Sequence, residues 1–188
     1  MKKFSINKNS VFSILLAIVI GAIINKIIPP HVTPVFTMVV SKNRISIVDI
    51  HQVRDIEMHK TVMIDRINLA DKSRFRHPKL GDLGYNGDFF ADIEAPFSVK
   101  VAGDYTFYVS SDDGFILSVD NQKLCEWTHD RPLSTSTCHV KLSAGSHNFT
   151  LNYFQGYGNA GLIMSYANTS SGKQYLAGDD SKFIEFQH

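Results

Sequence analysis

The sequence contains little excess charge and few cysteines. Among its 188 residues, 19 basic and 18 acidic side chains leave a formal net charge of +1. Nucleic-acid-binding proteins usually present a strongly basic surface, so this balance argues against DNA or RNA as a partner. The 2 cysteines are too few for a disulfide scaffold, although they can form one bridge. A chain of this length can instead bury a sizeable hydrophobic core.

The common catalytic motifs are also missing. The sequence contains no nucleophile elbow, no HExxH metal motif and no phosphate-binding loop. Acidic residues are frequent, but nothing pairs two of them across a cleft as glycoside hydrolysis requires. We therefore expect a protein that is not an enzyme. No internal repeat or low-complexity tract is visible.

One long apolar run lies near the amino terminus. Residues 1–9 are mostly polar and carry Lys2, Lys3 and Lys8, and the uncharged run VFSILLAIVIGAII follows them. Residues 10–28 have about the length that a tilted helix needs to cross a bilayer, so we expect a transmembrane anchor there. A cleaved signal peptide is the alternative, but no A-x-A-like cleavage site follows the run.

Positive charge is denser before this run than after it. The positive-inside rule then places residues 1–9 in the cytoplasm and the chain after Pro30 on the far side of the membrane. We therefore expect a single-pass membrane protein whose C-terminal domain is periplasmic or extracellular. Such compartments are oxidising, which permits a disulfide bond.

The two cysteines lie on segments that are expected to be consecutive strands. Residues 123–128 and 134–142 are joined by a turn that contains Pro132. Cys125 and Cys138 could then meet as cross-strand neighbours at the Cα separation that a disulfide needs. We therefore predict a disulfide bond between them.

Residues 29–74 are expected to link the anchor to the C-terminal domain. The segments 35–40 and 44–50 are apolar and β-branched enough for short strands. Residues 49–67 mix charged and aliphatic side chains, and periodicity does not distinguish helix from strand there. The whole segment is interpreted either as a tether packed on the domain or as a docking segment for another envelope protein.

Apolar and polar residues alternate regularly after Gly87. Period-two alternation over short runs is typical of half-buried strands. Turn-forming residues separate the runs, a pattern typical of an antiparallel sandwich or barrel. The alternating runs are residues 105–109, 115–119, 149–153 and 162–166.

Four motifs in this region resemble the protective-antigen (PA-fourteen) lectin-like domain family. They are GDYTF at 103–107, SDDG at 111–114, VD at 119–120 and LSAGSH at 142–147. The resemblance implies an all-β antiparallel β-sandwich or barrel, which we assign to residues 75–188. Members of the family are carried by glycosidases, fungal adhesins and bacterial toxins or surface proteins, where they commonly recognise carbohydrate, often through calcium.

Asp112 and Asp113 are the leading candidates for a binding site. Neighbouring strand residues point to opposite faces of a sheet, so two adjacent carboxylates do not normally reach one ion. In calcium-binding members of the family a cis peptide bond joins the two aspartates and turns both to one side. Two carboxylates with carbonyls and sugar hydroxyls would suit Ca²⁺. Read alone, Asp-Asp-Gly is also a favourable turn sequence.

A glycine-rich loop at residues 155–161 could complete a calcium site. Asn159 or Gln155 could donate a further oxygen, and Asp120 could approach from the side. Calcium-dependent fungal adhesins of the family supply such ligands from a longer second loop, so no motif fixes these residues. We take Asn159 as the third candidate metal ligand, beside the two aspartates.

Two aromatic residues are candidates for contact with a sugar ring. Trp127 and Tyr157 could stack on its apolar face, although packing in the core or in a loop would explain them equally well. Together, these features predict a membrane-anchored carbohydrate-binding module used for surface recognition or adhesion, with Ca²⁺ as its ligand-bridging ion. The alternative is a structural or assembly subunit of a cell-envelope complex that binds protein rather than sugar.

Overall fold

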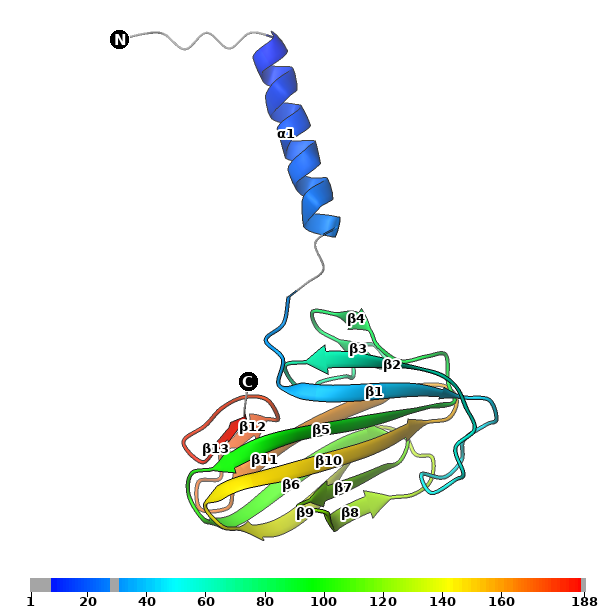
Figure 1. The fold of residues 1–188 in the computed structure, drawn as a ribbon, viewed down its shortest axis with the longest axis vertical. Coiled ribbons are helices and arrows are strands. Elements are labelled where there is room, and N and C mark those ends of the chain that lie inside the picture. Colours follow the sequence, from blue (N-terminus) through cyan, green and yellow to red (C-terminus); the bar gives the residue numbers. More distant parts are fainter. Residues whose placement is uncertain (1–7, 28–30, 187–188) are drawn as a thin grey trace. The chain divides into compact units, whose positions relative to one another are not determined.

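The computed structural model describes residues 8–27 and 31–186 (Figure 1). Its first unit contains one helix, α1 (Lys8–Ile27), which is rich in leucine and isoleucine and has Lys8 and Lys26 at its ends. Among the described residues, no helix is both long and apolar enough to span a bilayer. The predicted anchor at residues 10–28 is therefore not supported. Residues 1–7 and 28, which belong to the predicted topology, lie outside the described part.

The second unit, residues 32–188, is built from two main antiparallel sheets. In the larger sheet the strand order is β2-β1-β5-β10-β7-β8, and β13 also pairs with β5. This sheet consists of β1 (Phe36–Asn43), β2 (Ile56–Ile64), β5 (Phe89–Val99), β7 (Phe115–Val119), β8 (Gln122–Trp127), β10 (Gly145–Gln155) and β13 (Ile184–Phe186).

The smaller sheet has four strands in the order β12-β11-β6-β9. It consists of β6 (Gly103–Asp112), β9 (Ser134–Leu142), β11 (Gly161–Asn168) and β12 (Gln174–Leu176). A short hairpin pairs β3 (Arg76–His77) with β4 (Gly81–Asp82). The predicted all-β antiparallel fold is confirmed.

The core lies between the two main sheets, where the alternating apolar side chains meet. Phe149 from β10 packs within 5.5 Å of Phe36 from β1, measured between ring centroids. Phe107 and Met164 from the smaller sheet are buried in the same cluster. The described strands form separate sheets rather than a closed barrel, because β8 and β9 follow each other along the chain but belong to different sheets.

The domain begins earlier than the sequence predicted. Residues 32–74, interpreted as a tether, contribute β1 and β2 to the larger sheet, and β1 pairs directly with β5. Phe36 and Met38 from this segment are fully buried in the main core. The boundary at residue 75 is therefore wrong, because β1 occupies a position inside the sheet. Residues 29 and 30 lie outside the described part.

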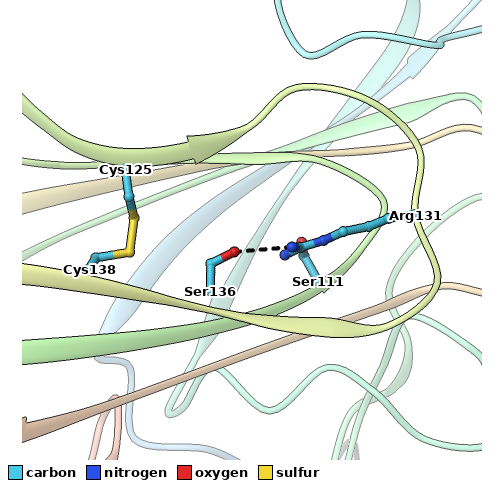
Figure 2. Close-up of a disulfide and its surroundings, with 5 residues drawn as sticks. All are labelled: Ser111, Cys125, Arg131, Ser136 and Cys138. Carbon is cyan, nitrogen blue, oxygen red and sulfur yellow. Dashed lines mark hydrogen bonds between the residues drawn. A yellow bond between two sulfur atoms is a disulfide. The ribbon is translucent and has the colours of Figure 1, made fainter.

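The predicted disulfide between Cys125 and Cys138 is confirmed, with the two Cα atoms 5.7 Å apart. Its setting differs from the prediction. The cysteines are not cross-strand neighbours in one sheet, because β8 is an edge of the larger sheet and β9 an edge of the smaller one. Figure 2 shows the bridge between these strands, so the disulfide links the two layers of the sandwich.

Replacing both cysteines by alanine is expected to lower the free energy of unfolding by about 3 kcal/mol, because the unfolded chain regains the entropy of an open loop. Denaturant titration of the oxidised protein and the Cys125→Ala/Cys138→Ala variant measures the difference. Thr137→Ala, an exposed change on the same strand, is the matched control and should stay within about 0.5 kcal/mol. Two free thiols in protein from its native compartment would contradict the bridge.

Candidate functional site

Asp112 and Asp113 lie where β6 ends, and the peptide bond between them is cis. This is the arrangement that the family resemblance implied. Both residues are largely buried, with 8% and 4% of their surfaces exposed. Gly114 follows them and is closely surrounded, since a Cβ there would overlap the ring of Phe154 and lie 2.6 Å from the Trp127 carbonyl oxygen. The close approach of these neighbours therefore requires glycine at that position.

The Asp113 carboxylate is oriented by backbone groups from two loops. The Gly156 N–H donates to Oδ2 at 2.8 Å, and the Arg131 N–H donates to Oδ1 at 3.2 Å. The Ser111 hydroxyl donates to the Asp113 carbonyl at 2.6 Å. Each carboxylate oxygen keeps a second lone pair for another donor or a cation.

Burial of the pair disfavours its negative charges. Burial first, and then the neighbouring Asp113 charge, raise the pKa of Asp112 to about 6, against the opposing effects of the Leu133 backbone N–H and Arg131. Burial also raises the pKa of Asp113, against hydrogen bonds from Gly156 and Arg131. The site therefore favours a proton or a cation beside these carboxylates.

Arg131, in the loop between β8 and β9, is a residue that sequence reasoning missed. Its Nη2 donates to the Ser111 hydroxyl at 2.7 Å and its Nη1 to the Ser136 hydroxyl at 3.0 Å. Figure 2 shows the guanidinium extending from its loop toward the two serines. An arginine in a loop carries no sequence signal of this role, because its partners come from two other strands.

The two aspartates line an open pocket of about 720 Å³ at this end of the sandwich. The pocket brings them together with two other predicted residues, Asn159 and Tyr157. Tyr157 is 97% exposed, so its ring is available to a ligand. The remaining walls, which the sequence did not predict, are residues 46–48, Asp88, Asp130–Pro132 and Gly156.

Trp127 does not line this pocket. Its half-exposed ring lies 5.0 Å from the Arg131 guanidinium carbon, on the strand that leads into the loop. The Arg131 guanidinium carbon also lies 5.5 Å from the ring of Phe115. The contacts that the structure gives Trp127 are therefore packing contacts, which was the alternative interpretation of this residue. A direct contact between Trp127 and a sugar stays a prediction.

The other residues considered as oxygen donors are engaged elsewhere. Gln155 is buried, with its Oε1 2.6 Å from the Tyr153 hydroxyl and its Nε2 donating to the Asn159 carbonyl. Asp120 lies in the turn between β7 and β8 and accepts from His147 at 2.6 Å. Neither residue is among those that line the pocket.

The donor set fits a hard cation with oxygen ligands. Among the described residues, no group of three His, Cys, Asp or Glu side chains could hold a metal. An ion beside Asp112 and Asp113 would therefore take its other ligands from the Asn159 amide, carbonyls, water or a bound hydroxyl. Calcium accepts such mixed oxygen sets at 6–8 positions.

The comparisons with known proteins agree with this fold. The model of the PA14 domain matches residues 79–181, more than half of the chain. The chain therefore belongs to the PA14 domain family. No curated protein matches it.

Several solved structures are similar to the chain. The PA14 domain of the MpAFP antifreeze protein has a TM-score of 0.60 and 14% identity, covering 78% of this chain and 91% of that one. A PA14 sugar-binding domain from an RTX adhesin has a TM-score of 0.60 and 17% identity, covering 78% and 95%. The epithelial adhesin 6 A domain from Candida glabrata, in complex with Galβ1-3GlcNAc, has a TM-score of 0.55 and 14% identity, covering 79% of this chain and 87% of that one.

The Asp112→Asn substitution is expected to stabilise the protein more at neutral than at acidic pH in a chelating buffer. The folded state holds the Asp112 proton more tightly than the unfolded chain, because the pKa rises from 3.8 to about 6. The wild-type residue is therefore most favourable below pH 3.8 and loses this contribution as pH rises through about 6. The difference in Tm between variant and wild type should thus grow from about pH 4 to about pH 7.

Asp104→Asn, a change to an exposed carboxylate on the same strand, is the control. Its difference in Tm from wild type should stay nearly constant over this range. A constant difference for Asp112→Asn as well would show that burial does not disfavour the Asp112 charge.

Proposed function

We propose that this domain is a carbohydrate-binding module whose ligand occupies the pocket at Asp112 and Asp113. The observation that carries the proposal is the pair of adjacent, buried carboxylates at an open pocket that the exposed Tyr157 also lines. Membership of the PA14 family and the fold shared with a sugar-binding adhesin domain and a disaccharide-bound adhesin domain support it.

The side chains at the pocket suit a polyhydroxylated ligand. Carboxylate oxygens of Asp112 and Asp113 accept hydrogen bonds from vicinal hydroxyls, and charged acceptors make these bonds stronger than neutral ones. The Asn159 amide offers both a donor and an acceptor. The Tyr157 ring offers a flat apolar surface for the C–H face of a sugar. This combination fixes both the position and the orientation of a terminal sugar.

Calcium dependence is part of the proposal. A Ca²⁺ ion held by Asp112, Asp113 and Asn159 would neutralise the repulsion between the carboxylates and offer open coordination positions to sugar hydroxyls. Asp113 is held in place by two backbone donors of the protein itself. The site is therefore oriented before the ligand arrives, which lowers the entropy lost on binding.

We further propose that the domain works outside the cytoplasm. The disulfide between Cys125 and Cys138 supports this, because structural disulfides persist in oxidising compartments. The predicted orientation of residues 1–9 and the absence of enzymatic activity stay predictions. Binding to another envelope protein stays the alternative function.

The double variant Asp112→Asn/Asp113→Asn should fold but lose both calcium-dependent stabilisation and glycan binding. Asparagine keeps the shape and the neutral acceptors while it removes the charges. A ligand present at about 100 times its Kd stabilises a protein by about 2.7 kcal/mol, so the wild-type Tm should rise with calcium and that of the variant should not. Thermal melting with calcium or with chelator, followed by a glycan array, measures both effects.

Asp104→Asn is again the matched control and should behave like wild type in both assays. The carbohydrate proposal fails if the wild-type protein binds no glycan with or without calcium. If glycans bind equally well in chelator, the module is a lectin without calcium dependence.

A further inference from the structure

A second cavity, of about 370 Å³, adjoins the proposed sugar pocket. Residues of the loop 155–160 line both, and Asn159 is shared between them. Gly87 lines the second cavity and its neighbour Asp88 lines the first. A ligand bound at the first pocket can therefore extend past Asn159 into the second.

One wall of the second cavity is a tight hairpin turn. Asp71 and Arg74 exchange backbone hydrogen bonds of 3.2 and 3.0 Å around Lys72 and Ser73. The φ angles of these two central residues are 51° and 60°, as a type I′ turn requires. The Ala160 N–H donates to the Ser73 carbonyl at 3.1 Å, which ties the turn to the shared loop.

Two aromatic rings that line the cavity, those of Phe75 and Tyr85, pack on buried rings of the core. The rings of Phe75 and Tyr153 are stacked at 5.2 Å, and Tyr85 packs on Phe89 at 6.3 Å, measured between centroids. The Tyr153 hydroxyl donates to the Asp112 carbonyl. The two cavities are therefore held in a fixed relation by buried side chains.

The two cavities carry opposite charge. Lys72 and Arg74 line the second, and Lys60 lies over the ring of Tyr85, with Nζ 4.9 Å from its centroid. Among the described residues that line this cavity, Asp82 is the one acidic side chain, and it lies 3.5 Å from Arg74. The first pocket is instead lined by more acidic than basic side chains, namely Asp88, Asp112, Asp113 and Asp130 against Arg131.

We infer that the second cavity is a subsite for an anionic group on the sugar next to the one in the first pocket. This inference rests on the proposed carbohydrate-binding function and narrows its ligand class to acidic oligosaccharides. Lys72 and Arg74 would make charge-assisted hydrogen bonds to a carboxylate or sulfate. Tyr85 would contact the sugar ring and Asn86 a hydroxyl, since both line the cavity.

The inference is tested with disaccharides in matched pairs that differ only at C5 of the second sugar. One member carries a hydroxymethyl group and the other a carboxylate. The full-length protein should bind the carboxylate member roughly tenfold more tightly, as one additional charge-assisted contact provides. The ratio should shrink as salt is raised, because the interacting groups are exposed. Calorimetric titration measures both affinities.

The Lys72→Met/Arg74→Gln variant should lose the preference for the carboxylate member, because both cationic side chains that line the subsite are removed. Methionine suits position 72, because it keeps the side-chain length and is no more strained than lysine at positive φ. Lys141→Met, a change to an exposed lysine on β9, is the matched control and should keep the ratio. Retention of the ratio in the Lys72→Met/Arg74→Gln variant would overturn the subsite.

The outcomes separate this inference from the proposed function. The wild type could bind both members equally, and this binding could be lost in Asp112→Asn/Asp113→Asn. That result would support the sugar pocket and contradict the anionic subsite. If the wild type binds none of the disaccharides and no neutral glycan, both the sugar pocket and the anionic subsite are contradicted. Tighter binding of the carboxylate member that depends on Lys72 and Arg74 supports both.

Discussion

Two backbone N–H groups, from Gly156 and Arg131, donate to one buried carboxylate, and the geometry of the pocket depends on them. Asp113 is the residue that receives these bonds, and it lies at the end of a strand from the smaller sheet. Gly156 follows a strand of the larger sheet, and Arg131 comes from the loop between the sheets. One side chain therefore joins three separate backbone segments at one end of the sandwich.

A residue of the hydrophobic core also contacts the same site. Tyr153 is fully buried, stacks on Phe75 and bonds the Asp112 carbonyl through its hydroxyl. Burial raises the pKa of this tyrosine well above its ordinary value, so the hydroxyl remains a donor at any physiological pH. The position of the aspartate pair is thus set by packing in the core as well as by the surface loops. Packing in the core and the geometry of the site are therefore linked through one ring.

Many strands of the domain could be predicted from local alternation of apolar and polar residues, whereas the positions of β1 and β2 in the sheet could not. The alternating runs identified β6, β7, β10 and β11, because each buries one face against the opposite sheet. β2 gave no such signal, because it is an edge strand whose side chains are mostly exposed. The partners of β1 could not be predicted, since it pairs with residues some fifty positions away, for example Val40 with Ala91. Local patterns carry no information about such pairing.

The same limit applies to the site. The Asp-Asp-Gly motif and its family context predicted the cis-linked pair, because that information lies within three consecutive residues. The role of Arg131 depends on Ser111 and Ser136, which only the fold brings near. The wall at residues 46–48 comes from a segment that was assigned to a tether. Motifs therefore predicted the aspartate pair, and tertiary structure decided which other residues surround it.

The bridge between Cys125 and Cys138 has a consequence for the motion of the pocket. It joins the edges of two sheets and turns the intervening segment, which carries Arg131, into a short closed ring. Without the bridge, β8 and β9 would be connected only through the loop between them. The Arg131 N–H in this ring donates to Asp113, so the covalent link shortens the chain that is free to move away from the carboxylate.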